Sequence, residues 1–126
     1  MVRATWDELT AGLDDPDLAL LTEFRDICRG LPDTEERVSR TEVAYAVRRI
    51  FASAYMKSHW LEVAVHLLRE AEHPQLRASF ATTSTVMTHR LTIGTLDELR
   101  SVVPLVEEAH DTVGPGTSPT GRRGAR

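Results

Sequence analysis

Positively charged side chains and histidines recur along the middle of this 126-residue chain, among residues that favour β-strands. Arginine offers a planar fork of donors that suits phosphate or carboxylate groups, and lysine adds a mobile point charge. Histidine can transfer a proton near neutral pH. If strands carry these side chains to one uncovered sheet face, that face becomes a platform for an anionic ligand. The residues of this candidate site are Arg48, Lys57, His59, Arg77, His89 and Arg90.

Each of these residues also has a simpler interpretation. Cations on strands often protect sheet edges and pair with nearby acids. In a strand, His89 would point the same way as Leu91 and Ile93, which makes it either a core residue or a group at the end of a pocket. Aromatic residues could stack nucleic-acid bases beside the cations, although aromatics at strand spacing are more often core. The aromatics concerned are Tyr45, Phe51, Tyr55 and Trp60.

Motifs for catalysis or metal binding are weak or missing from the sequence. It contains no Gly-x-Ser-x-Gly motif, no glycine-rich phosphate loop and no His-Glu-x-x-His spacing. Cys28 lies in an apolar stripe and is expected to be buried. The acids Asp14, Asp15 and Asp17 are those expected at a helix start. We therefore expect no cofactor, no metal site and no catalytic residue, and an enzyme is the less favoured class.

The charge distribution limits the classes of partner. The net charge is −4, and the tail after residue 113 contributes three arginines and no acid, so the rest of the chain has seven more acids than Lys and Arg residues. An acidic body argues against non-specific DNA binding as the main task. There is no signal-peptide pattern and no run of the ~20 apolar residues that a membrane helix needs. With one cysteine, the chain is expected to be cytoplasmic, without a membrane partner.

Helix signals lie at both ends of the chain. Thr5 and Thr95 each precede a glutamate by three residues, which predicts capped helices that begin there. A further helix is expected from Asp14 to Gly30. Pro104 falls inside the last helix and predicts a kink or a restart.

Residues 42–68 decide the fold class, and their periodicity allows two interpretations. As a helix, this stretch has an acceptable apolar stripe, and His59, His66 and His73 recur every seven residues. As two strands, apolar residues alternate with small or polar ones, with a turn at residues 56–59. Shorter strands are expected at residues 38–41, 77–81 and 85–93.

Several short motifs resemble those of a known family. They are Phe51-Ala52, Trp60-Leu61, His73-Pro74 with Arg77, and Thr88-His89-Arg90-Leu91 leading to Asp97-Glu98. Across residues 38–110 the chain resembles the bacterial domain of unknown function 5655 family. Lys57 and His59 also match a Lys-x-His pair of the related YdhG-like group.

The length of the chain suits one domain, and the resemblance implies an α+β fold, so a single α+β domain is expected over residues 1–113. Its N-terminal helices would precede a curved antiparallel sheet of about five strands, a capped helix would close it, and helices would pack on one face. Residues 114–126 are expected to form a disordered Gly/Pro/Arg tail. The family occurs alone or beside predicted endonuclease-type domains, and the YdhG-like group has been described as frataxin-like iron chaperones.

These observations lead to one main functional hypothesis and two alternatives. The main hypothesis is a non-enzymatic binding domain whose basic, His-bearing sheet face holds an anionic ligand or a nucleic-acid segment, or serves a nucleic-acid-processing protein. The first alternative is a frataxin-like metal (iron) chaperone or small enzyme centred on His89 and His59. The second is a structural interaction domain that acts as a homodimer.

Overall fold

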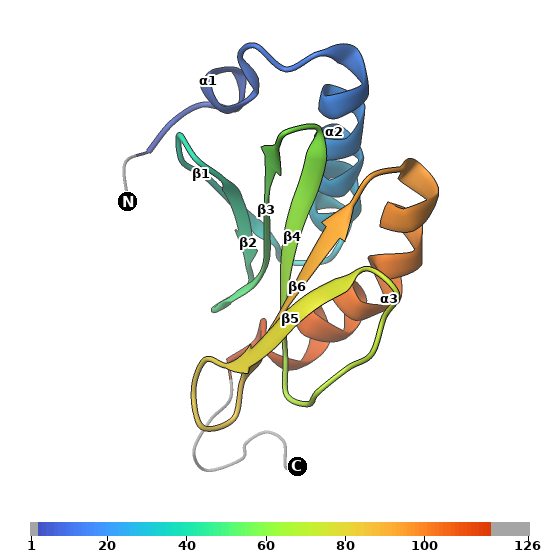
Figure 1. The fold of residues 1–126 in the computed structure, drawn as a ribbon. Helices are drawn as coiled ribbons and strands as arrows, with labels where there is room; N and C mark the ends of the chain where they lie inside the picture. Colours follow the sequence, from blue (N-terminus) through green and yellow to red (C-terminus); the bar gives the residue numbers. More distant parts are fainter. Residues whose placement is uncertain (1–2, 117–126) are drawn as a thin grey trace.

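The computed structural model describes residues 3–116 and shows an α+β fold, as the resemblance implies (Figure 1). Within these residues, three helices accompany one six-stranded antiparallel sheet. The helices are α1 (Trp6–Thr10), α2 (Asp15–Arg29) and α3 (Leu96–Thr112). The strands are β1 (Glu35–Val38), β2 (Val43–Ala46), β3 (Ile50–Lys57), β4 (Trp60–Leu67), β5 (Leu76–Ala81) and β6 (Met87–Ile93).

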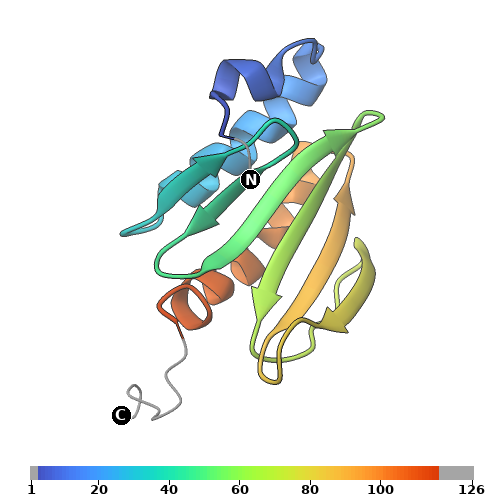
Figure 2. The same ribbon diagram turned by 90° about the vertical axis from the view of Figure 1, so that its left-hand side faces the viewer.

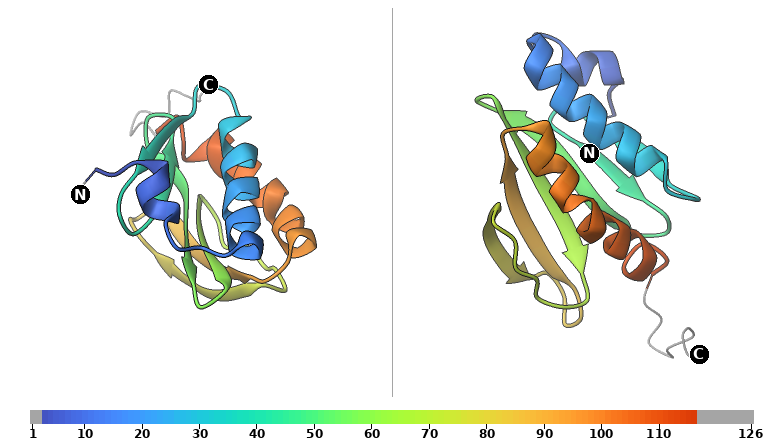
Figure 3. Two further views of the ribbon diagram at one scale, coloured as in Figure 1. Left: turned by 90° about the horizontal axis from the view of Figure 1, so that it is seen from above. Right: turned by 90° about the vertical axis from the view of Figure 1, so that its right-hand side faces the viewer.

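The molecule has two layers. The strands lie in the order β1-β2-β3-β4-β6-β5, and α2 and α3 lie side by side across one face of the sheet (Figures 2 and 3). No element of residues 3–116 covers the other face, which we call the open face (Figure 2). A two-layer arrangement of this kind can bury one side of a strand and expose the other, although all four residues of β2 are buried.

Strand β4 shows this alternation most clearly. Leu61, Val63, Val65 and Leu67 are buried beneath the helices, whereas the residues between them reach the open face. Period-two alternation of apolar residues therefore predicted the strands correctly, and the helical interpretation of residues 42–68 is wrong.

The sheet contains one strand more than the expected five, because residues 43–57 are divided. The chain leaves β2 at Ala46, and the register shifts before β3 begins at Ile50. In the connection, the backbone N–H groups of Arg48 and Arg49 both donate to the carbonyl oxygen of Gly114, at 2.8 and 2.9 Å. Gly114 is buried, so the first residue of the expected disordered tail belongs to the fold. Residues 117–126 of that tail lie outside the described residues.

The core lies between the sheet and the two long helices. Phe24 of α2 meets the buried Tyr45 ring edge to face, with centroids 5.8 Å apart. Cys28 is also buried there, and its burial raises the pKa of its thiol, so it is a protonated core residue as expected. On α3, Val102 and Val106 complete the same cluster.

At Pro104, where a kink or a restart was expected, helix α3 does not restart. The helix continues from Leu96 to Thr112 without a restart, and Pro104 is on its exposed side. The helix carbonyl that lacks its N–H donor is therefore on the solvent side, where water can donate a hydrogen bond to it. None of the described helices is long and apolar enough to cross a membrane.

Candidate functional site

The six residues of the predicted site are distributed over several parts of the molecule. Arg48 lies in the connection between β2 and β3, at the opposite end of the sheet from Lys57 and His59. Arg77 lies where the register of the edge strand β5 is interrupted. Of the six, Lys57 and Arg90 are on the open face, because their cross-strand partners on β4 are residues of its exposed side.

His89 points the other way. It is fully buried on the helix-covered side, where its Nε2 accepts a hydrogen bond from the backbone N–H of Ala71 at 2.9 Å. This bond places the proton of the neutral ring on Nδ1, which has no hydrogen-bond partner among residues 3–116. His89 is thus a core residue, and a ligand on the open face cannot reach it.

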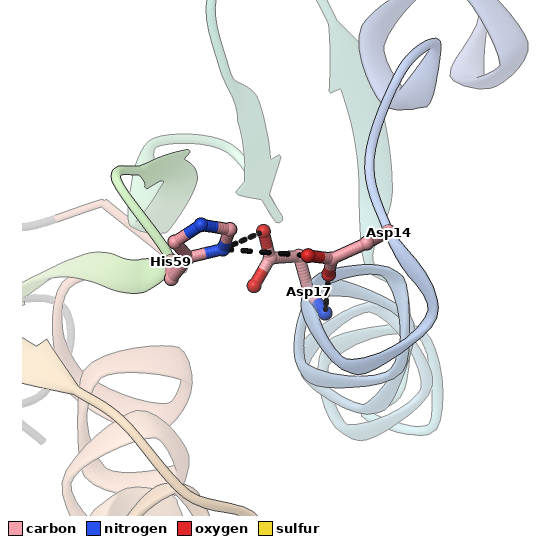
Figure 4. A group of neighbouring side chains, drawn as sticks. All are labelled: Asp14, Asp17 and His59. Carbon is pink, nitrogen blue, oxygen red and sulfur yellow. Dashed lines mark hydrogen bonds and ion pairs between the residues drawn. The ribbon is translucent and has the colours of Figure 1, made fainter.

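His59 stands at the tip of the β3–β4 hairpin, in a two-residue turn. Ser58 and His59 adopt φ angles of 50° and 70°, which turns the imidazole toward the start of α2 (Figure 4). Its Nδ1 lies 2.9 Å from Oδ2 of Asp17 and 3.4 Å from Oδ2 of Asp14. Asp14 also caps α2, because its Oδ1 accepts a hydrogen bond from the backbone N–H of Asp17 at 3.0 Å.

These three side chains fasten the hairpin to α2, and they could also hold a cation. One ligand atom from each lies within 4.8 Å of the other two. In the sequence, helix capping alone accounts for Asp14 and Asp17, and their contact with His59 was not predicted. The contact joins residues 42 positions apart, so no local spacing signals it.

The open face carries a small hollow between β3, β4 and β6. Its volume is about 20 Å³, and Glu42, Ser53, Tyr55, Glu62, Ala64 and Arg90 contribute to its lining. Oε1 of Glu62 accepts a hydrogen bond from the Thr92 hydroxyl at 3.0 Å. The Arg90 guanidinium makes no ion pair or hydrogen bond with any other residue that the structure describes. We call this feature the open-face hollow.

Aromatic residues divide between the open face and the core. Tyr45 and Phe51 are buried, so they cannot stack on a nucleic-acid base. Trp60 remains 47% exposed beside Lys57, its cross-strand neighbour. Its ring lies close over Gly94, where a Cβ atom would come within 2.6 Å of the indole. Tyr55 is half-buried at the open-face hollow.

One half-buried polar network beside the core was not foreseen from the sequence. Glu36 of β1 accepts two hydrogen bonds from Arg25, at 2.9 and 3.1 Å, and one from the Tyr45 hydroxyl at 2.8 Å. Burial by itself would raise the pKa of the Glu36 carboxyl, but these bonds outweigh it and hold the pKa below its usual value. The network joins α2, β1 and β2 and has a structural role.

A third histidine, on β4, lies on the open face. His66 bonds through Nδ1 to the Thr88 hydroxyl at 2.9 Å, and Thr88 also contacts Thr82. Burial lowers the pKa of His66, so its ring is neutral at physiological pH.

Comparison with known proteins identifies the family. No curated protein and no solved structure matches the chain. The family model described as "Domain of unknown function (DUF5655)" matches residues 7–113, the helices and the sheet included. The chain therefore belongs to the DUF5655 family.

Proposed function

We propose that this domain is a non-enzymatic binding module that holds an anionic group of its ligand on the open face through Arg90, with Lys57 as a second cation farther along the same face. The observation that carries the proposal is the position of Arg90. It stands on an uncovered sheet face, beside a hollow, without a partner among residues 3–116. We also propose a cytoplasmic location, because Cys28 is the chain's single cysteine.

The surroundings of Arg90 support this role. Its neighbours in register are Ala64 and Ala78, whose short side chains leave the guanidinium accessible from above the sheet. Lys57 and the exposed Trp60 lie toward the hairpin end of the same face. A planar guanidinium flanked by small residues suits bidentate contact with a carboxylate or phosphate.

Thermal-shift measurements with carboxylates, nucleotides and short oligonucleotides test the proposal. At least one of these probes is expected to raise the melting temperature of the native chain, and Arg90→Ala should abolish the shift. Arg48→Ala and Arg77→Ala are matched controls, since each removes an exposed arginine that is away from the open-face hollow. If no probe shifts the melting temperature, or if Arg90→Ala responds like the controls, the proposal is wrong.

We propose metal binding as the second candidate function, now centred on His59 without His89. Zinc bound about 2.0–2.2 Å from each ligand in a tetrahedron places the ligand atoms about 3.4 Å apart. The His59 Nδ1 lies 2.9 and 3.4 Å from the two aspartate oxygens, so small side-chain movements would admit an ion.

Calorimetric titration with zinc and with ferrous iron separates this candidate from a purely structural contact. His59→Gln should weaken binding of the ion at least about tenfold, because it removes a ligand nitrogen. Asp15→Asn is the control, because Asp15 lies in the same helix turn but outside the three-residue group. Equal binding by the native chain and His59→Gln would exclude this site.

A further inference from the structure

The open-face hollow has the size of a single small polar group. A cavity needs about 10–15 Å³ to admit one water molecule, and this one measures about 20 Å³. A primary ammonium group is close to water in size. The hollow therefore accommodates one end of a ligand, while the rest of the ligand lies along the sheet.

The lining offers mainly hydrogen-bond acceptors. Glu42 and Glu62 supply carboxylates, and Ser53 and Tyr55 supply hydroxyl groups. The Glu42 carboxylate has no partner among residues 3–116, and Glu62 is bonded only through Oε1, to Thr92. An ammonium group has three donors and no acceptor, which matches this set of groups. A phosphate or carboxylate in the same place would meet two negative charges.

Arg90 supplies the opposite charge at the same hollow. It lies within the lining but makes no ion pair with Glu42 or Glu62. The face therefore presents a cation and two carboxylates that are not bonded to one another. A ligand that carries both an amine and a carboxylate can satisfy both kinds of group, whereas a polyanion such as nucleic acid satisfies only Arg90.

We propose that the open-face hollow is an amine subsite and that the ligand of the open face carries an amine and a carboxylate. The amine enters between Glu42 and Glu62, and the carboxylate binds Arg90. The ligand is either a free amino-carboxylate or a peptide with both charges. This inference rests on the proposed function and narrows it, since it excludes nucleic acid as the preferred ligand.

Titrations followed by amide NMR test this assignment on the full chain. The probes are acetate, methylammonium, ω-amino acids from glycine to 6-aminohexanoate, a blocked Lys/Asp tetrapeptide and a thymidine oligonucleotide. We expect the amides of Ser53, Tyr55, Glu62 and Arg90 to shift. A probe with both charges should bind about tenfold more tightly than acetate or methylammonium, because it makes a second charge-assisted contact. The ω-amino acids also measure the separation between the two subsites.

Substitutions test which residues bind the amine and which bind the carboxylate of the ligand. Glu42→Gln and Glu62→Gln should each weaken binding of the tightest two-charge probe about tenfold and leave acetate unchanged. The Glu62→Gln variant keeps a side-chain oxygen that can accept the Thr92 hydrogen bond, and thermal denaturation verifies that each variant folds. Arg90→Ala should weaken binding of both this probe and acetate, while Arg77→Ala should weaken neither.

The outcomes are distinguishable. Preference for the tetrapeptide supports a peptide ligand, and preference for an ω-amino acid supports a free one. If acetate binds as well as every two-charge probe, or if the oligonucleotide binds most tightly, the amine subsite is wrong and the proposed function stands. If no probe shifts an open-face amide, both fail.

Discussion

The Tyr45 hydroxyl is buried with one hydrogen-bond acceptor within reach, the Glu36 carboxylate at 2.8 Å. Arg25 holds the same carboxylate by two further bonds. A buried hydroxyl without such a partner would cost free energy, and so would the half-buried Glu36 carboxylate without its donors. These three residues therefore stabilise the packing of β1 and β2 against α2.

Replacing Tyr45 by Phe should lower the free energy of unfolding by about 1–2 kcal/mol, because the ring volume is kept and only the hydrogen bond to Glu36 is lost. Urea denaturation measures the change. Tyr55→Phe is the matched control, since the Tyr55 hydroxyl has no hydrogen bond within residues 3–116. Equal effects of the two substitutions would show that the bond to Glu36 contributes no stability.

Side-chain partners of this kind could not be predicted from the sequence. Arg25 and Tyr45 reach Glu36 across 11 and 9 positions, and His59 reaches Asp17 across 42. Helical or strand periodicity reports which face a residue occupies, but the partner depends on how separate elements meet. Strand alternation therefore predicted correctly that His89 and Leu91 point to the same side of the sheet. The predicted site, in contrast, combined residues that lie in separate parts of the fold.

At the scale of elements, α3 carries a proline in its interior, Pro104, on the exposed side of the helix. Proline removes one backbone hydrogen bond and crowds the carbonyl four residues earlier, that of Arg100. The buried face of the helix, with Val102 and Val106, offsets this cost.

Pro104→Ala should raise the free energy of unfolding by about 1–3 kcal/mol, because alanine restores the N–H group and favours the helix. Chemical denaturation monitored by circular dichroism provides the measurement. Glu107→Ala, on the same exposed surface, serves as the control and should have little effect. An unchanged or lower stability in Pro104→Ala would show that α3 is bent to fit its proline.

Helices and most strands could be read from the sequence because caps and alternation are local signals. Thr5 and Thr95 do cap α1 and α3, and the strands near residues 77–81 and 85–93 exist as β5 and β6. The separation of β2 from β3 was missed because none of the connecting residues, Val47, Arg48 and Arg49, is of a type common in turns. That turn depends on Gly114, from the far end of the chain.

At the scale of the whole molecule, two histidines give stability opposite dependences on pH. For His110, burial would lower the pKa, but the Pro32 carbonyl and Asp111 outweigh it and raise the pKa. Its stabilising contribution is present below the unfolded value of about 6.5 and is lost as the pH rises through the folded pKa. His66 has a lowered pKa, so its contribution is present above that value and is lost as the pH falls.

Paired variants can reveal this opposition. His110→Gln should destabilise the protein more at pH 5.5 than at pH 8.5, because only protonated His110 can donate to the Pro32 carbonyl and to Asp111 at the same time. His66→Gln should show the reverse: relative to the native chain, the variant should be more stable at pH 5.5 than at pH 8.5. Urea unfolding at both values measures the differences. The same sign for both variants would contradict the assigned environments.

The homodimer hypothesis concerns the outer edge of β5, the last strand of the sheet order. Phe80 and Leu68 are 45% and 42% exposed near this edge. If two copies pair there, light scattering after size exclusion should give twice 14.1 kDa, and Phe80→Glu should restore the single mass. Leu96→Glu, at the start of α3, is the control. A mass of 14.1 kDa at high concentration would contradict the hypothesis.

The sheet order also has a consequence for how the chain folds. Strands β1 to β4 each pair with their neighbour in sequence, and so do β5 and β6, but β6 lies between β4 and β5. The chain can thus form two units of sequentially adjacent strands, β1–β4 and β5–β6, independently of each other. Pairing of β4 with β6 joins these two units in a single register. Because this contact is non-local, we expect its formation to limit the folding rate.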